Sequence, residues 1–459
     1  MKRVDFGNGK TLTNILATAL PMFVAQTLNL LYNIVDRIFI ARIPGIGTAA
    51  LGAVGMCFPI VILITAFTNM FGSGGAPLFS ISRGAGNRKE ASLIQNTAFF
   101  LLLMTAAILT ILGEAVGRPV LSVFGTSDQA MVHALPYLRI YLLGTLFSMI
   151  STGMNPFINA QGYSMVGMTT VIIGAAANII LDPLMIFVLG LSVEGAAIAT
   201  ILSQALSAAF VLRFLFGNKV DYRLRFLRAE EIRHCGQRAR RIIGLGMAAF
   251  IMQFTNSVVS ISCNNVLAHV GGDIYVSAMT MINSARQMFE TPLLAIAEGT
   301  SPIMSYNYGA KRMRNVLEAG KIMFAMSFAY CIVIWGVMRL FPMFMLGIFS
   351  SDPVLKETAL PCFNIYFSTF IFMVFQHGGQ STFKSLGKKN HAIFFSLFRK
   401  AVIVVPLTYL LPYAFHMGVN GVFAAEPISN VVGGLACFIT MLHVVLPELK
   451  AGEAEKSQP

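Results

Sequence analysis

Long apolar segments separated by short polar loops dominate the pattern of hydrophobic and polar positions along the chain. The segments are continuous and do not alternate, and they reach the roughly 20 residues that a helix needs to cross a bilayer. The joining loops often carry glycine or proline, as in Pro44-Gly45-Ile46-Gly47. The pattern predicts about twelve transmembrane helices, which we place at residues 13–41, 49–81, 91–113, 130–155, 166–189, 193–216, 240–269, 274–306, 315–340, 356–383, 391–415 and 419–446.

The two halves of the chain repeat each other. Gly74 recurs as Gly299, 225 positions later, and Val193-Glu-Gly195 recurs as Val419-Asn-Gly421, 226 positions later. Six helices in each half keep the same topology, so the repeat is parallel, with its axis along the membrane normal. The expected fold class is therefore an all-α integral membrane protein made of two six-helix lobes.

Composition and charge support this class. The chain of 459 residues is 56% hydrophobic and 12% charged, whereas soluble proteins carry about 25% charged residues. The formal charge of +13 does not indicate a nucleic-acid partner, because the basic residues collect in the loops. Alternate loops are rich and poor in lysine and arginine, which predicts cytoplasmic termini and a cytoplasmic central linker. The six cysteines show no CxxC spacing, so neither a metal cluster nor a disulfide framework is expected.

These observations give the expected domain organisation. Residues 1–216 form an N-terminal lobe, and residues 242–447 form a C-terminal lobe. Residues 217–241 form a basic cytoplasmic linker, and residues 448–459 form a cytoplasmic tail. The linker is read as a determinant of topology, with binding of anionic lipid headgroups as the alternative.

One apolar run carries a buried amide and a buried carboxylate. Asn178 and Asp182 are four residues apart and share one face of a helix. A carboxylate inside a membrane needs a partner, a proton, a cation or a water-filled cavity. Pro183 follows directly, so Asp182 is expected at a kink. We interpret this stretch as an ion-coupling site.

The first span supplies a second carboxylate. Gln26, Asn29, Asn33 and Asp36 are spaced as one helical stripe. The seventh span repeats the polar stripe with cysteine in place of aspartate, and Thr408 stands at the position that corresponds to Asp182. The stripe of the seventh span consists of Gln253, Asn256, Ser260 and Cys263. The buried acids therefore belong to the N-terminal half alone, which packing symmetry does not explain.

Two chemistries fit these residues. Asp36, Asn178 and Asp182, with the sixth-span Thr200, are expected to line a polar pocket in the N-terminal lobe. Adjacent buried carboxyl groups favour binding of a proton, while carboxylate, amide and hydroxyl oxygens also suit an alkali cation. Isolated polar residues in membrane helices more often hold helices together. For the two aspartates we favour function.

Glu290 is a weaker candidate. It lies one turn after Arg286, so an intrahelical ion pair is as good an interpretation as a place in a substrate cavity. Glu298 and Glu426 are not expected to couple ions. The candidates for the cavity and for substrate binding are Gln26, Asn29, Asn33, Gln253, Asn256 and Glu290.

Several motifs resemble the multidrug and toxic compound extrusion (MATE) family, and its MepA-like and DinF-like bacterial members most of all. The resemblance runs from about Leu12 to Leu446. The motifs are Tyr32-Asn-Ile-Val-Asp-Arg-Ile-Phe-Ile40, Gly72-Ser-Gly-Gly-Ala-Pro77, Asn178-Ile-Ile-Leu-Asp-Pro183, Gly195-Ala-Ala-Ile-Ala-Thr200 and Ser305-Tyr-Asn-Tyr-Gly-Ala-Lys311.

The resemblance implies a V-shaped pair of lobes in a bacterial inner membrane. It implies export of cationic or amphipathic organic compounds, driven by entry of protons or sodium. It assigns Asp36, Asn178, Asp182 and Thr200 to the coupling site, with no cofactor beyond H⁺ or Na⁺, no structural metal and a monomeric state. NorM-like members add C-terminal acids, but this chain has Cys263 in the matching span, so a sodium site there is not expected.

Two rival functions differ in class. A flippase for lipid-linked oligosaccharides should line its cavity with several basic residues, and few stand in the middle of these spans, among them Arg286, Arg399 and Arg139. A membrane enzyme is disfavoured because no HExxH motif, nucleophile elbow or phosphate-binding glycine loop is present. Efflux of organic cations or amphipathic drugs is therefore the preferred function, and membrane lipid is the only other expected partner.

Overall fold

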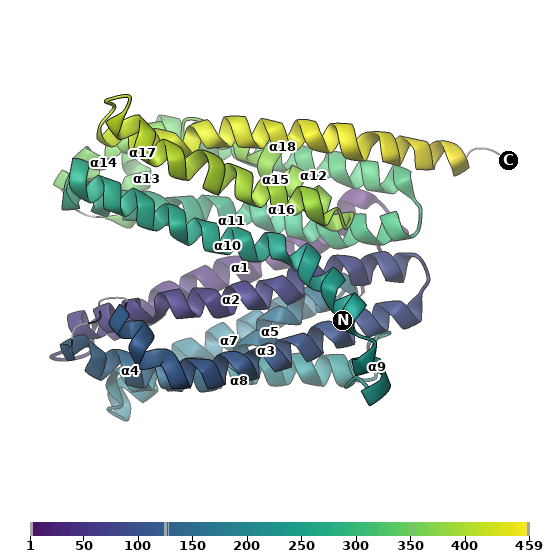
Figure 1. The fold of residues 1–459 in the computed structure, drawn as a ribbon, viewed down its shortest axis with the longest axis horizontal. Coiled ribbons are helices and arrows are strands. Elements are labelled where there is room, and N and C mark those ends of the chain that lie inside the picture. The colour runs from purple at the N-terminus through teal and green to yellow at the C-terminus, as the bar shows by residue number, and fades with distance from the viewer. Residues whose placement is uncertain (1–2, 124–125, 127, 351, 457–459) are drawn as a thin grey trace. The chain divides into compact units, whose positions relative to one another are not determined.

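The computed structural model describes residues 3–123, 126, 128–350 and 352–456. Every regular element over those residues is helical, which confirms the predicted all-α fold (Figure 1). The chain forms two compact units. Unit 1 comprises residues 1–5 and 24–246, and unit 2 comprises residues 6–23 and 247–459.

Unit 1 holds most of the N-terminal half. It includes α1 (Thr11–Ala41) from residue 24 onward and α10 (Gly236–Val270) up to residue 246. Between them lie α2 (Gly47–Gly84), α3 (Arg88–Val123), α4 (Asp128–Leu143), α5 (Thr145–Gly153), α6 (Asn155–Ala160), α7 (Ser164–Pro183), the π-helix η1 (Leu184–Val188), α8 (Ser192–Phe216) and α9 (Ala229–Arg233).

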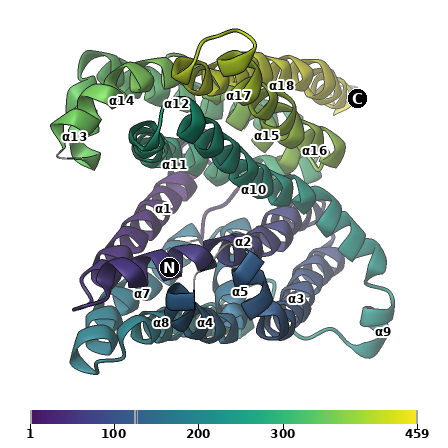
Figure 2. The ribbon, with the colours of Figure 1, turned by 60° about the vertical axis from the view of Figure 1, so that its left-hand side comes forward.

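Unit 2 holds the first part of α1 and the rest of α10. Its other elements appear in green to yellow in Figure 2. They are α11 (Asp273–Gly309), α12 (Met313–Leu340), α13 (Pro342–Phe349), α14 (Pro353–Tyr366), the 3-10 helix η2 (Phe370–Phe372), α15 (Met373–Ser385), α16 (Lys389–Leu397), the π-helix η3 (Phe398–Val404), α17 (Val405–Tyr413) and α18 (Val419–Lys456).

The described helices include nine that are long and apolar enough to cross a membrane, and up to eleven if two bent pairs each count as one span. The bent pairs are Asp128–Leu143 with Thr145–Ala160, at 53°, and Pro353–Tyr366 with Phe370–Ser385, at 48°. The predicted span 274–306 falls on α11, a helix of 37 residues that is not among these candidates. The protein is an integral membrane protein with many spans.

The backbone shows the repeat that the sequence predicts. The two bent pairs begin 225 residues apart, at Asp128 and Pro353. Left-handed backbone conformations recur at the same spacing, as at Gly162 (φ 95°) and Gly387 (φ 71°). Because a positive φ marks a specific chain reversal, this match shows that both halves use the same turns between their helices.

Each unit contains one very close helix crossing at a repeated glycine. In unit 1 a Cβ on Gly74 of α2 would lie 2.3 Å from the carbonyl oxygen of Ile242 on α10. In unit 2 a Cβ on Gly299 of α11 would lie 2.6 Å from the Cα of Ala19 on α1, and the Thr18 hydroxyl donates to the Gly299 carbonyl at 2.7 Å. Small residues allow membrane helices to approach this closely.

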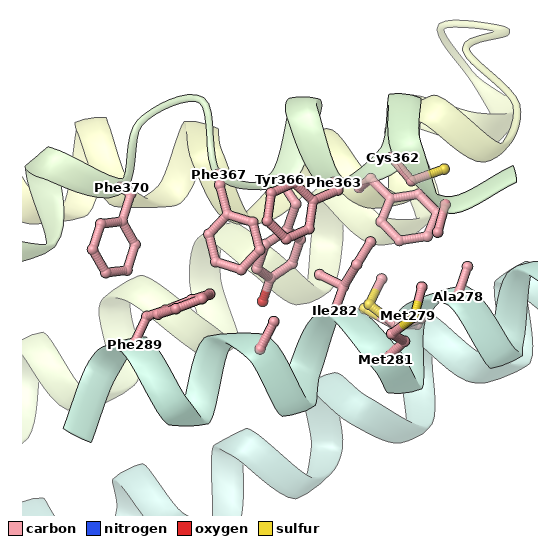
Figure 3. Packing of buried hydrophobic residues seen from close by; sticks show 14 of the residues in the cluster. Ala278, Met279, Met281, Ile282, Phe289, Cys362, Phe363, Tyr366, Phe367 and Phe370 are labelled. Atoms are coloured by element: carbon pink, nitrogen blue, oxygen red, sulfur yellow. The ribbon is translucent and has the colours of Figure 1, made fainter. Parts of the chain in front are cut away.

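Part of the apolar core of unit 2 lies between α11 and α14 (Figure 3). Phe289 of α11 and Phe367 after α14 meet edge to face with ring centroids 6.2 Å apart. Tyr366 is 6% exposed, and its oxygen points toward α11 in Figure 3. Helix α11 therefore has one side packed against aromatic rings, and Arg286 and Glu290 stand on the same helix.

The linker of unit 1 is held by ion pairs. The Arg225 guanidinium donates to both oxygens of Glu231 at 2.7 and 2.6 Å, and the Arg228 amide donates to the same carboxylate at 2.9 Å. These donors lower the pKa of Glu231 to about 2. Arg238 contacts Glu90 on α3 at 3.0 Å, which fixes the start of α10 to unit 1.

Candidate ion-coupling site

Asn178 and Asp182 form a hydrogen-bonded pair in the last turns of α7. The run from Ser164 is rich in alanine, isoleucine and methionine, so it forms one helix as far as Pro183. Asn178 Nδ2 donates to Asp182 Oδ1 at 3.1 Å, and the two residues are 2% and 0% exposed. The predicted kink takes the form of the π-helix η1 that follows Pro183. Single π turns of this kind occur often at functional sites.

Asp36 reaches this pair from α1. The Asp36 and Asp182 carboxyl groups lie close enough to interact with each other. Two carboxyl groups can share a hydrogen bond only when one of them carries a proton, because ionised carboxylates are acceptors only. The structure therefore joins two acids that are 146 positions apart in the sequence.

Three oxygens of this group have no donor from the described residues. Asp36 Oδ1, Asp182 Oδ2 and Asn178 Oδ1 are buried and accept no hydrogen bond from the described N–H and O–H groups. Buried polar atoms normally have partners, so the set is suited to a shared proton or to a hard cation that prefers oxygen ligands. The described residues contain no group of three or more His, Cys, Asp or Glu side chains that would hold a metal ion.

Arg37 does not neutralise Asp36 directly. Its guanidinium carbon lies 4.5 Å from the centroid of the Phe58 ring. Its charge acts on the Asp36 carboxyl group, but the described residues show no ion pair between the two side chains. Neighbours in a helix point about 100° apart. The cation–π contact leaves Asp36 free to face Asp182.

Thr200 stands on α8, the helix that packs against α7. Its hydroxyl donates to the Ala196 carbonyl of its own helix at 3.0 Å, and the described hydrogen bonds do not join it to either aspartate. Two neighbouring polar residues of α8 form hydrogen bonds to other helices. Ser207 donates to the Thr170 carbonyl at 2.8 Å, and Gln204 Oε1 accepts from Ser151 at 2.7 Å.

The cavity candidates on α1 are exposed or half-buried. Asn29 and Asn33 are exposed, and Asn33 Nδ2 donates to the Asn29 carbonyl at 2.6 Å. Gln26 is half-buried. The stripe is therefore continuous along α1, but among its members Asp36 alone contacts the Asn178–Asp182 pair through a described interaction.

The cavity candidates of unit 2 lie on two helices, α10 and α11. Gln253 and Asn256 are half-buried on α10, and Asn256 Oδ1 is buried without a partner among the described residues. Glu290 forms ion pairs with Arg286 of its own helix at 3.4 Å and with His377 of α15 at 2.9 Å. The intrahelical pair expected from the sequence is thus present, together with a second partner that sequence spacing does not show.

Two tyrosines near the site were missed from the sequence. Tyr137 and Tyr141 of α4 both interact electrostatically with Asp36, and their rings stack with centroids 6.2 Å apart. A signal was available, because they are spaced four apart on one helix face and Tyr141 recurs as Tyr366. Both tyrosines are therefore near Asp36.

The corresponding position in unit 2 lacks acids. Cys263 and Thr408, which the repeat aligns with Asp36 and Asp182, lie 3.8 Å apart from sulfur to hydroxyl oxygen. The same two helices of each repeat therefore meet at the same point. The acids are a property of unit 1 and are not required by the fold.

Two repeats of apolar helices, with a buried carboxyl pair inside one of them, define a membrane protein of the transporter class. The comparisons with known proteins give its family. The chain belongs to the MatE family, whose model matches residues 21–184 and 248–410.

Curated relatives match almost the full length of the chain. The Multidrug export protein MepA of Staphylococcus haemolyticus is 24% identical over 429 residues, which are 92% of this chain and 91% of the relative. A protein named FAD transporter from Shewanella oneidensis is 23% identical over 457 residues, 97% of each chain.

Solved structures share the fold. An outward-facing multidrug resistance MATE family transporter of the MOP superfamily superposes with a TM-score of 0.89, covers 99% of each chain and is 22% identical. A MATE structure in complex with MaD3S gives a TM-score of 0.90 at 21% identity, again over 99% of each chain.

Proposed function

We propose that this protein is a secondary-active exporter of drug-like organic compounds, driven by inward movement of H⁺ or Na⁺ through Asp36, Asn178 and Asp182. The observation that carries the proposal is the carboxyl pair of unit 1, with its three buried oxygens that lack donors among the described residues. A group of this kind binds and releases a small cation more readily than a fully paired one does.

The cation would act by linking two helices. With a proton or sodium bound, the carboxyl groups on α1 and α7 attract each other through it; without it, two ionised carboxylates repel each other. The bound ion shifts the protein toward one conformation only to the extent that it binds that conformation more tightly. The π-helix η1, directly after Asp182 and Pro183, is a place where α7 departs from regular geometry.

The substrate class follows from the relatives. Relatives at 21–24% identity are named multidrug export proteins, and a relative of similar identity is named a transporter of FAD. We therefore propose amphipathic organic compounds as substrates. We place the protein in a bacterial plasma membrane with both termini and the linker in the cytoplasm, as the distribution of basic loops indicates.

The test is efflux of a fluorescent organic cation from proteoliposomes under an imposed pH gradient or an imposed sodium gradient. We expect one gradient to drive transport. Asp36→Asn and Asp182→Asn should insert and fold but lose gradient-driven efflux. Asp128→Asn, which changes an exposed carboxylate of the same unit, serves as the matched control and should transport like the unaltered protein. Gradient-driven efflux by the Asp36→Asn/Asp182→Asn double variant would refute the assignment.

A further inference from the structure

Unit 2 contains a buried cluster of charged side chains that the proposed ion coupling does not use. Its centre is Glu426 of α18. Lys400 Nζ donates to Glu426 Oε1 at 2.7 Å, and Arg399 Nη1 lies 3.2 Å from the same oxygen. All three side chains are at most 7% exposed. Two cations therefore share one oxygen of one carboxylate.

The other end of the cluster lies on α11. Arg286 pairs with Glu290 at 3.4 Å, and Glu290 also meets His377 Nε2 at 2.9 Å. Arg286 interacts electrostatically with Glu426, and Glu290 with Arg399, so the charges of the two ends act on each other. The Arg286 Nε atom is buried and has no partner among the described residues.

The cluster carries an excess of positive charge. Arg286, Arg399 and Lys400 supply three cations, while Glu290 and Glu426 supply two carboxylates. With neutral His377 the sum is +1, and with protonated His377 it is +2. The next acid on α11, Glu298, lies eight residues beyond Glu290, about 12 Å along the helix axis. A buried cation without a counter-ion is strongly unfavourable.

The donors of these cations are only partly used. A guanidinium has five N–H donors and an ammonium has three. The Arg399 guanidinium also donates to the Asn430 side chain, and the Ser429 hydroxyl donates to the Arg399 carbonyl at 3.0 Å. These neighbours position Arg399 without adding negative charge. The helix departs from α geometry at this point, because Arg399 and Lys400 lie in the π-helix η3.

The repeat shows that the charges of unit 2 are an addition to the shared fold. At the offset of 226 positions, Glu426 corresponds to Thr200, Lys400 to Gly174 and Asn430 to Gln204. Unit 1 therefore has no charged residue at these three places and carries its two acids at Asp36 and Asp182, whereas unit 2 holds bases in excess. The polarity of the polar core is opposite in the two repeats.

We propose that the cluster of unit 2 is a binding site for an organic anion, in which the carboxylate, phosphate or sulfonate group of a transported compound pairs with Lys400, Arg399 and Arg286. This deepens the proposed function, on which it rests, by naming a chemical group of the substrate. The anion supplies the negative charge that the cluster lacks. It approaches from the side of Arg286 and Glu290, whose side chains are the most exposed of the five at 16% and 14%.

The alternative is a purely structural network. In that case Lys400 and Glu426 stabilise the fold together, and replacing either one has the same effect on ligand binding. If the cluster is an anion site, the Lys400 and Glu426 variants should change ligand affinity in different directions. Lys400→Gln removes one positive charge from the cluster, while Glu426→Gln removes a negative charge and leaves more donors for the ligand.

The experiment measures binding of two dyes to the purified full chain in lipid nanodiscs. One is a cationic rhodamine ester, and the other is a sulfonated rhodamine of net negative charge with a similar ring system. The unaltered protein should bind both. Lys400→Gln should raise the Kd of the sulfonated dye about tenfold or more, with less than about a twofold change for the cationic dye. Glu426→Gln should leave binding of the sulfonated dye unchanged or tighter.

Two further variants keep the test decisive. Lys389→Gln makes the same substitution at the exposed first residue of α16 and should change neither Kd. If Lys400→Gln fails to fold, Arg286→Gln takes its place, because Glu290 keeps His377 as a partner. It too should weaken binding of the sulfonated dye selectively.

The outcomes separate the two proposals. The anion site is refuted if the unaltered protein does not bind the sulfonated dye, or if the Lys400 and Glu426 variants weaken its binding equally. Neither result affects the gradient-driven efflux assigned to Asp36 and Asp182. Conversely, efflux that survives the double aspartate replacement would refute the ion coupling while leaving dye binding by unit 2 intact.

Discussion

At the scale of single residues, Asn178 connects the candidate site to the identity of the driving ion. Its Nδ2 donates to Asp182 Oδ1 at 3.1 Å, while its Oδ1 is buried without a donor among the described residues. The Nδ2 donor stabilises an ionised carboxylate, and the Oδ1 atom is a ligand suited to sodium. Removing the side chain therefore affects the two candidate ions in opposite directions.

We expect Asn178→Ala to shift the concentration of driving ion that gives half-maximal efflux. If the ion is sodium, a lost oxygen ligand raises that concentration, by about fivefold to tenfold for a contribution of about 1–1.5 kcal/mol. If it is a proton, loss of a donor to the ionised carboxylate lowers the proton concentration required.

The measurement is initial efflux rate against sodium concentration at fixed pH, and against pH without sodium. Asn218→Ala, in the exposed linker, is the control and should move neither curve. An unchanged half-maximal concentration in both titrations would remove Asn178 from the site.

Helical spacing predicted the local part of this site but not its long-range part. Asn178 and Asp182 are one turn apart, so their pairing follows from helix geometry. Helical spacing relates residues only within one helix. Asp36 and Asp182 were therefore assigned to one pocket from the chemistry of buried carboxyl groups and not from spacing. For the same reason the Lys400–Glu426 pair was not predicted.

At the scale of helices, the repeated glycines decide how closely neighbours pack. Gly74 of α2 faces the Gly246 Cα at 2.7 Å and the Ile242 carbonyl at 2.3 Å, measured from the position a Cβ would take. Both contacts are backbone atoms, which cannot rotate away as a side chain can. A methyl group at this position must push α2 and α10 apart.

Gly74→Ala should therefore destabilise unit 1, by about 1–3 kcal/mol as other overpacked sites do. Gly55→Ala is a matched control on the same helix, because nothing lies within 4 Å of a Cβ there. It should be neutral or stabilising by up to about 1 kcal/mol, since alanine favours helix over glycine. Thermal unfolding of both variants in the same detergent checks the difference, and equal melting temperatures would contradict the close crossing.

The helix pattern predicted where most spans begin and end but not how they deviate from straight helices. The bends of 53° and 48° lie inside the predicted spans 130–155 and 356–383. Hydrophobicity does not encode such a break, because the two arms of each pair together still pass as one apolar span. Proline was a better guide at Pro183, where a kink was expected and the π-helix η1 follows.

At the scale of the whole molecule, the repeat explains the fold and the differences between repeats point to function. Bends and left-handed turns recur at a spacing of 225 residues, as at Gly162 and Gly387. The acids of unit 1 and the excess bases of unit 2 do not recur. Packing requirements are shared by both repeats, so the residues that differ are the ones to assign to ion coupling and to substrate.

At this scale, the orientation of the chain in the membrane can be tested by labelling one native residue. Of the six cysteines, Cys235 alone is partly exposed, and the other five are buried. It lies in the basic linker just before α10, on the side that the positive-inside rule assigns to the cytoplasm. A membrane-impermeant maleimide should therefore label the native protein in inside-out vesicles and leave it unlabelled in right-side-out vesicles.

Two variants complete this test. Cys235→Ser should abolish labelling in both kinds of vesicle, because thiols packed between helices are inaccessible to the reagent. Asp128→Cys in the Cys235→Ser background places a thiol at the exposed start of α4, at the opposite end of a predicted span, and should show the reverse pattern. Labelling of Cys235 from the outside would invert the topology, so that the basic loops and both termini face away from the cytoplasm.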